Sequence, residues 1–429
     1  MNVPRMDHGL FSFIGIFAQF DTTIFVVSSL IKTAVVLGVV LGIVSYTVMA
    51  ERRVSAALQD RVGPNRVGPF GLLQPICDSA KFIFKEEFTP DHVNKFYFWL
   101  APVLAVCPAL ITIAVVPFAS LQEVQIPFFD ILIPSPGVIA DIDIGVLFVF
   151  ALASLSVYGI VLAGWSSNSK YPFLGGIRSS AQMISYEISM GLSIIPLFMV
   201  FGTLNLSEII TKQIEHGWTI FPVMSASWTF ESFFLLPFLL LSFGLFLVSS
   251  FAETNRTPFD LPESETELVG GYHTEYSSMK FALFFLGEYA AMIVASGVMV
   301  TLFLGGWSLP LGFIQQAMTH LGIEPIGWFS TLVDWFAGQG HPWWFIPIQV
   351  GVFLSKVFVF LFFFIWVRWT VPRFRYDQLM NLGWKIFLPT ALANVLLTGI
   401  ALAILPFAHH LWSSIWHPVW NYLRLMIHH

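Results

Sequence analysis

The amino-acid sequence predicts an all-α integral membrane protein with about eight transmembrane helices and one amphipathic helix at the membrane interface. Of its 429 residues, 56% are hydrophobic and only 11% are charged, whereas soluble domains carry roughly 25% charged residues. Eight mostly apolar stretches are long enough to cross a bilayer, which takes about 20 residues. Most lysines and arginines lie in four of the segments between these stretches.

The predicted spans make the whole chain, residues 1–429, a single polytopic membrane domain. The fourth span is the least regular, because Glu187 falls in its first turns. A shorter apolar stretch near residues 10–20 contains Gly15 and Gln19, which argue against a further full span. The eight predicted spans are residues 24–50, 96–118, 141–164, 183–202, 232–252, 279–304, 343–367 and 386–408.

The lysines and arginines predict the orientation of the chain. Fifteen of the 20 lie in four connecting segments if the third is extended to Lys280. Cytoplasmic loops of membrane proteins carry such an excess of positive residues. We therefore expect these segments in the cytoplasm and, with eight spans, both termini on the outer side of the membrane. The predicted cytoplasmic loops are residues 51–95, 165–182, 253–278 and 368–385.

Two classes of ligand are not expected on this chain. It has no run of basic residues, so nucleic acid is not indicated as a partner. Cys77 and Cys107 are its only cysteines, and two thiols do not ligate an iron–sulfur cluster or form a zinc-binding pair motif. No metal site is therefore predicted.

The first predicted cytoplasmic loop contains an amphipathic helix that begins near Leu73. Apolar residues recur at helical spacing along one face, and Gln74, Asp78, Lys81 and Lys85 follow another. Such a helix lies either at the membrane surface or against a partner. Four arginines of the same loop serve either as topology determinants or in ion pairs, for which arginine is well suited. They are Arg52, Arg53, Arg61 and Arg66.

The stretch from residue 251 to residue 288 is rich in carboxylates. Clustered carboxylates repel one another, so some are expected to hold protons near neutral pH and to pass them on when the local field changes. The alternative is a solvated acidic loop. The seven carboxylates are Glu253, Asp260, Glu263, Glu265, Glu267, Glu275 and Glu288.

Ionisable residues also occur inside the predicted spans. Glu288 lies about nine residues into its span, Lys356 lies near the middle of the seventh span, and Glu187 and Lys32 lie in two others. Ionisable groups in hydrocarbon are costly and usually mark an ion or proton pathway. They predict a polar path from the acidic stretch into the membrane. A structural pair between Glu288 and Lys356 is the alternative.

All four predicted cytoplasmic segments resemble the H subunits of respiratory complex I, the proton-pumping NADH:quinone oxidoreductase. The resemblance covers roughly residues 25 to 408. The segments that carry it are AERRVSAALQDRVGPNRVGPFGLLQPICDSAKFIFKE, SNSKYPFLGGIRSSAQMISYE, AETNRTPFDLPESETELVGGYHTEYSSMKFALFFLGEY and PRFRYDQLMNLGWKIFLP.

The resemblance implies a subunit that lies where the soluble redox arm meets the membrane arm. It would line the quinone chamber and begin a chain of acidic residues. The proton-linked residues would be Glu187, Glu253, Glu263, Glu265, Glu267, Glu275 and Glu288, joined by the intramembrane Lys356. The residues at the quinone chamber and its interface with the soluble arm would be Arg52, Arg61, Asp78, Arg256 and Asp260.

The same resemblance implies the ligands, partners and location. Quinone, either ubiquinone or menaquinone, would be the substrate, while NADH, FMN and iron–sulfur clusters would be bound by partner subunits. The partners would be the soluble redox-arm subunits on the cytoplasmic face and other membrane-arm subunits. The chain would span the bacterial inner membrane several times, with both termini on the periplasmic side.

Three alternative functions fit parts of the sequence. One is the related subunit of a membrane-bound hydrogenase or of a ferredoxin- or F420-linked quinone reductase. A second is a self-sufficient secondary transporter, which would need a substrate site at the midplane between broken helices. A third is a purely structural anchor for a redox arm.

Overall fold

The structure is a computed structural model that describes residues 8–120, 124–126, 131–133, 137–220, 230–260, 269–311, 315, 318 and 327–405. Within these residues, eight helices are long and apolar enough to cross a membrane. The predicted fold class, an all-α integral membrane protein, is therefore confirmed. The eight helices are Val26–Leu58, Lys95–Val115, Gly145–Ser166, Lys170–Phe201, Phe234–Glu253, Ser278–Phe303, Trp343–Thr370 and Tyr376–Leu405.

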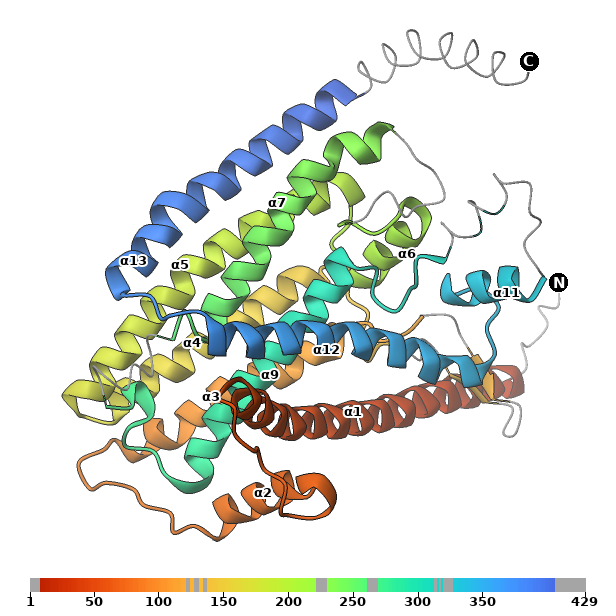
Figure 1. The fold of residues 1–429 in the computed structure, drawn as a ribbon. Coiled ribbons are helices and arrows are strands. Elements are labelled where there is room, and N and C mark those ends of the chain that lie inside the picture. Colours follow the sequence, from red (N-terminus) through yellow and green to blue (C-terminus); the bar gives the residue numbers. More distant parts are fainter. Residues whose placement is uncertain are drawn as a thin grey trace, which may run out of the picture.

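The secondary-structure elements follow one another in the chain order shown by the colours of Figure 1. The helix that begins at α13 continues through a π-helical turn, η6, to Leu405. In chain order the elements are α1 (His8–Leu58), η1 (Pro69–Gly71), α2 (Gln74–Phe84), α3 (Lys95–Thr112), η2 (Ile113–Val115), β1 (Val124–Ile126), β2 (Ile131–Ile133), α4 (Gly145–Ser166), α5 (Lys170–Phe201), α6 (Leu206–His216), α7 (Phe230–Glu253), η4 (Gly271–His273), α9 (Ser278–Phe303), α11 (Gly327–Phe336), η5 (Trp343–Phe345), α12 (Ile346–Thr370), α13 (Tyr376–Asn381) and η6 (Leu382–Phe387).

Three helices extend beyond the apolar stretches that predict them. α1 continues to Leu58 rather than ending near residue 50, α5 begins at Lys170 rather than at 183, and the last helix begins at Tyr376 rather than at 386. Apolar composition marks only the part of a helix that lies in hydrocarbon. The 32 residues of α5 span about 48 Å at 1.5 Å per residue, compared with a hydrocarbon core of about 30 Å. The connections at residues 167–169 and 371–375 are consequently much shorter than the predicted loops.

One short hairpin interrupts the helical architecture. β1 and β2 pair antiparallel, with Val124 opposite Ile133 and Ile126 opposite Ile131. It lies in the connection between η2 and α4, at the end of the bundle that also carries α6 and α11 (Figure 1).

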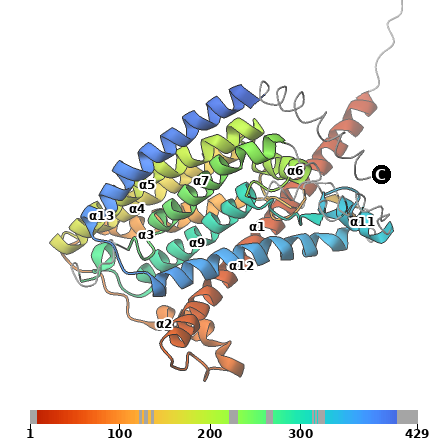
Figure 2. The same cartoon turned by 45° about the horizontal axis from the view of Figure 1, so that its top comes forward.

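The central helix of the bundle is α9. Of its residues in the span, 67% are buried, the largest share among the eight helices. It packs against α1, α3 and α12 and also contacts α2, α6 and α7, and Figure 2 shows it enclosed by these neighbours. Small residues permit close packing elsewhere in the bundle, between α3 and α4. At Gly159 of α4, a β-carbon would lie only 2.7 Å from the backbone nitrogen of Ala105 in α3, so these two backbones meet directly.

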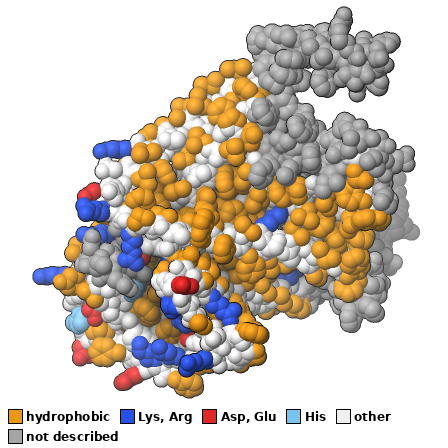
Figure 3. Space-filling model, in the orientation of Figure 1, with side chains coloured by type: hydrophobic (Ala, Val, Ile, Leu, Met, Phe, Trp, Pro, Cys, Tyr) orange, Lys and Arg blue, Asp and Glu red, His pale blue; other side chains and the backbone are white. Residues whose placement is uncertain are grey.

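The two ends of the bundle differ in charge. α2, the α4–α5 turn, the start of α9 and the α12–α13 turn gather at one end, here termed the charged end (Figure 1). Lysines, arginines and acidic residues cluster there, whereas the side of the molecule is largely apolar (Figure 3). The opposite end, with the β1–β2 hairpin, α6 and α11, is termed the outer end. The described chain begins in α1 and stops at Leu405 towards the outer end.

Helix α2 has the predicted amphipathic character. It begins at Gln74 with Pro75 in its first turn, where proline is tolerated. Its apolar side chains are uncovered within this chain: Ile76 and Ile83 are each 63% exposed and Phe84 is 88% exposed. This exposed apolar face is what a helix at a membrane interface or a docking surface requires.

Candidate functional site

The segment after α7 folds back into the bundle and carries Arg256 inward. Gln182 of α5 anchors it, because its side-chain amide donates hydrogen bonds to the carbonyl oxygens of Ala252 (2.7 Å) and Phe259 (2.6 Å). The backbone N–H of Phe374 in the α12–α13 turn donates to the carbonyl oxygen of Pro258 at 3.2 Å. Two separate elements therefore fix the position of this segment.

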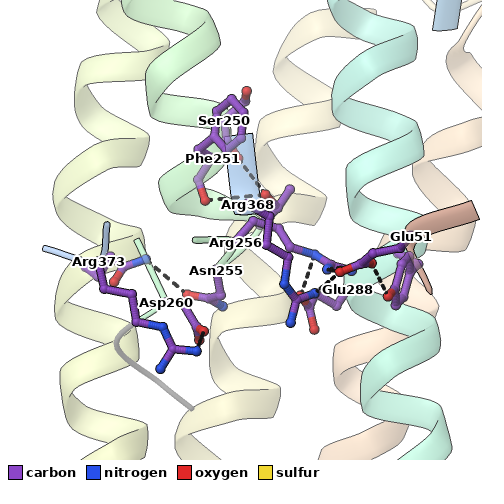
Figure 4. A network of polar contacts seen from close by, with 12 residues as sticks. Glu51, Ser250, Phe251, Asn255, Arg256, Asp260, Glu288, Arg368 and Arg373 are labelled. Carbon is purple, nitrogen blue, oxygen red and sulfur yellow. Dashed lines mark hydrogen bonds and ion pairs between the residues drawn. The ribbon is translucent and has the colours of Figure 1, made fainter. Parts of the chain in front are cut away.

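Arg256 lies at the centre of a group of charges from four parts of the chain (Figure 4). Its Nε is 2.7 Å from Oε1 of Glu288 on α9, and its Nη1 is 3.2 Å from Oε2 of Glu51 on α1. Arg368 at the end of α12 places its Nη1 2.5 Å from Oε1 of Glu51. Tyr289 donates a hydrogen bond to Oε2 of Glu51 at 2.6 Å, and its ring lies 4.1 Å from the guanidinium carbon of Arg256. These five residues are termed the buried ion cluster.

The buried ion cluster balances two carboxylates against two guanidinium groups. The side chains of Arg256, Glu51 and Glu288 are only 3%, 7% and 15% exposed. Burial opposes the charged form of Arg256, but Glu288, Tyr289 and Glu51 together raise its pKa well above the usual value. Arg256 therefore stays charged, and any change of protonation in this group falls on its acidic partners.

A cavity of about 100 Å³ adjoins the buried ion cluster. Glu288 lines it together with Glu253 at the end of α7, while its deeper wall is formed by apolar residues such as Val298. Glu187 lies on α5 between the lining residues Met183 and Met190 and accepts a hydrogen bond from Ser154. It is close enough to Glu253 for their charges to interact. The structure thus brings together Glu187, Glu253 and Glu288, three of the sequence-predicted carboxylates.

Other predicted residues form separate groups nearer the surface. Asp260 is 4% exposed and its Oδ2 is 3.0 Å from Nη2 of Arg373, a pair that Figure 4 shows apart from the buried ion cluster. Arg52 pairs with Asp78 at 2.7 Å, linking the end of α1 to α2. Arg61 is exposed and donates to the side-chain oxygen of Gln59 at 2.7 Å.

The remaining acidic predictions divide into two sets. Glu275 lies half-buried in the connection between η4 and α9. Glu263, Glu265 and Glu267 lie outside the described residues, so their roles stay predictions. Within the described ranges, no three His, Cys, Asp or Glu side chains gather in a way that would hold a metal ion.

Lys356 lies near the middle of α12, and its ammonium reaches the segment that follows α9, away from the buried ion cluster. Its ammonium donates to three carbonyl oxygens, those of Leu304 (2.8 Å), Gly306 (2.8 Å) and Ser308 (2.6 Å). The ring of Trp218 lies 4.2 Å from its Nζ. Lys356 therefore has its partners just after α9, and Glu288 pairs with Arg256. The structure does not contain the Glu288–Lys356 pair that the sequence left as an alternative.

Sequence reasoning did not single out three members of the buried ion cluster: Glu51, Tyr289 and Arg368. Glu51 directly precedes two arginines and reads as the start of a polar loop, but α1 continues through it and carries it into the bundle. One signal was available for Tyr289, which directly follows Glu288 in the same span. Glu51 is 205 positions away from Arg256 in the chain and 238 positions away from Tyr289. Contacts over such separations leave no local pattern in the sequence.

Comparison with known proteins finds relatives over most of the chain. The NADH dehydrogenase family matches residues 31–399. The first-numbered H subunit of NADH-quinone oxidoreductase from Cytophaga hutchinsonii is 45% identical over 387 residues, which cover 89% of this chain and 98% of that protein. The second-numbered H subunit from Koribacter versatilis is 45% identical over 386 residues, with the same two coverages. The H subunit from Rhodospirillum rubrum is 45% identical over 359 residues, covering 84% of this chain and 89% of that protein.

These matches extend over nearly the whole described bundle and over the same segments that form its charged end. The chain therefore belongs to the NADH dehydrogenase family, among the H subunits of NADH-quinone oxidoreductase.

Proposed function

We propose that this chain, a membrane subunit of NADH-quinone oxidoreductase, lines the quinone chamber and couples quinone reduction to proton translocation. In this proposal quinone is the substrate, and NADH, FMN and the iron–sulfur clusters are bound by partner subunits. The names of the relatives favour this enzyme over the hydrogenase and the ferredoxin- or F420-linked alternatives.

The observation that carries the proposal is that Glu288 belongs to two groups at once. It pairs with Arg256 in the buried ion cluster and also lines the cavity that contains Glu253. A charge that develops beside the cluster therefore changes the electrostatic surroundings of a carboxylate that faces the cavity. Such changes act strongly where water is largely excluded.

The chemistry of quinone reduction supplies such a charge. A quinone takes up two electrons and two protons to become a quinol, and electrons that arrive before protons leave negative charge in the chamber. Negative charge nearby favours the protonated form of Glu288, while Arg256 keeps its own charge. A proton taken up at Glu288 then has Glu253 and Glu187 as the next carboxylates along the bundle.

The charged end is the proposed docking surface for the soluble redox-arm subunits. In this proposal it faces the cytoplasm of a bacterium, and both termini lie in the periplasm. The concentration of lysines and arginines at this end supports that orientation, by the positive-inside rule. The uncovered apolar face of α2 and the neighbouring Arg52–Asp78 pair supply contacts for a partner. The apolar sides of the bundle fit lipid and other membrane-arm subunits.

Replacement of Glu288 by Gln tests the proposal. We expect both NADH-driven proton translocation and quinone reduction to fall in membrane vesicles that contain the assembled complex, because Gln holds neither the charge nor an exchangeable proton. Proton translocation is followed by quenching of a pH-sensitive dye, and quinone reduction by oxidation of NADH.

The matched control is Glu208→Gln, the same chemical change at an exposed carboxylate of α6 at the outer end. Both rates should stay at the wild-type level in this variant. Wild-type rates for Glu288→Gln, in complex shown by native gel electrophoresis to be fully assembled, would remove Glu288 from the coupling route.

A further inference from the structure

A second cavity lies between α1, α9 and α12, on the side of the bundle. Its volume is about 210 Å³. Its floor is buried, with Val40 and Phe353 only 3% and 1% exposed, whereas Val35 and Val39 at its rim are 59% and 44% exposed. The cavity therefore opens sideways from the bundle, towards the surface that faces lipid in a membrane.

The walls of this cavity are apolar apart from a single side chain. Valines, isoleucines, leucine, phenylalanines and two glycines line it, and Lys32 is the one ionisable residue among the lining residues that the structure describes. An apolar cavity of even 150 Å³ stays free of water and accepts hydrocarbon molecules. A quinone headgroup would need hydrogen-bond donors for its two oxygens, and the apolar walls provide none.

Lys32 lies in the outer part of the first span, six residues after Val26, where the described apolar span begins. It precedes Glu51 of the charged end by 19 residues on the same helix, a distance of about 28 Å along the axis, close to the thickness of the hydrocarbon core. Gly137, Val138 and Ile139 from the outer end line the same cavity, which places it independently in that half of the bundle. Lysines at this depth extend their ammonium groups towards the headgroup region.

We propose that this cavity is a binding site for an anionic phospholipid of the outer leaflet. One acyl chain occupies the apolar cavity, and the phosphate group pairs with Lys32. The negative headgroup complements the positive charge of this lysine, and the apolar walls fit the chain. A lipid bound here fills the space between α1 and α12, which flank the central helix α9.

The test uses the assembled complex in phosphatidylcholine nanodiscs that contain a small fraction of photoactivatable phosphatidylglycerol, with a diazirine in its acyl chain. We expect cross-links in the described α1 and α12 segments around Val39 and Phe353, identified by mass spectrometry. Lys32→Gln should lower this labelling by roughly fivefold, as for the loss of one partly exposed ion pair. Lys32→Arg, which keeps the charge, should retain it.

A second pair of variants tests the cavity itself. Val36→Phe places a larger side chain in the lining and should exclude the acyl chain, whereas Leu41→Phe makes a similar change at a 40% exposed position of the same helix outside the cavity and should not. Labelling unchanged by both Lys32→Gln and Val36→Phe would overturn the proposal. Equal labelling by a photoactivatable phosphatidylcholine would overturn the choice of an anionic lipid. Displacement of the lipid by a quinone photoprobe that labels the same residues would assign the cavity to quinone.

Discussion

The two ends of the molecule hold buried charges in opposite ways. At the charged end, Arg256 is surrounded by ionisable side chains from other helices. At the outer end, the ammonium of Lys356 is surrounded by backbone carbonyl oxygens of the chain that follows α9. Carboxylates change their charge when they take up a proton, whereas backbone carbonyls do not. The charges around Arg256 can therefore change when a proton is taken up or released. The carbonyl oxygens around Lys356 cannot change their charge in this way, and they are suited to holding a helix end in place.

The outer arrangement matches the donors of an ammonium to carbonyl oxygens beyond the end of α9. Leu304 is the C-cap of this helix, and Gly306 and Ser308 lie in the turn that follows it, so their carbonyl oxygens have no donor within the helix. An ammonium has three donors, and Lys356 directs them to Leu304, Gly306 and Ser308. We infer that Lys356 is a structural clamp between α12 and the end of α9, and the sequence-based role in proton transfer becomes the alternative to test.

The largest expected effect is that of Arg256→Gln. The substitution leaves Glu51 and Glu288 buried without the guanidinium that pairs with both, and breaking a buried ion pair in this way costs about 3–5 kcal/mol. We expect loss of quinone reductase activity and a marked drop in the thermal stability of the purified complex. Arg256→Lys, which keeps the charge but not the two-sided contact, should restore most of the thermal stability and only part of the activity. Normal activity in Arg256→Gln would show that the cluster does not matter for function.

Lys356→Met should have an intermediate effect on stability, and it tests whether the two ends of the molecule have different roles. The substitution leaves three carbonyl oxygens without their donor, which costs at least about 1–3 kcal/mol. We expect a lower denaturation temperature of the purified complex, while quinone reduction and proton translocation per assembled complex stay near the wild-type level. Reduced translocation at unchanged stability would instead return Lys356 to the proton route, as the sequence predicted.

The smallest effect on stability is expected at the exposed pair of the charged end. The side chains of Arg52 and Asp78 are 49% and 27% exposed, and ion pairs in such positions contribute about 0–1 kcal/mol. Arg52→Gln should therefore leave the denaturation temperature of the complex nearly unchanged. A fall in quinone reduction without a change in stability would support the predicted place of Arg52 at the quinone chamber. A large loss of stability would show that burial is not what distinguishes this pair from the buried ion cluster.

The sequence was informative about individual site residues but not about how they combine. Glu288, Glu253 and Glu187 were predicted from carboxylates in or beside apolar spans. The structure places Glu288 and Glu253 in the lining of one cavity and Glu187 close enough to Glu253 for their charges to interact. Arg256 was predicted from its place in the acidic stretch. Glu51 and Arg368 were not predicted, because each ends an apolar span in the company of other charges, where an exposed position is the ordinary expectation. Glu263, Glu265 and Glu267 lie outside the described residues.

The sequence by itself determined the membrane class, the eight spans and the concentration of charge in four segments. These are local properties, since a bilayer imposes a minimum length and an apolar composition on each helix separately. Only the tertiary structure decided which charges are buried together, and with which partners. Packing around α9 brings Glu51, Arg256, Glu288 and Arg368 into contact from positions far apart in the chain, and the same packing directs Lys356 to the backbone at the opposite end.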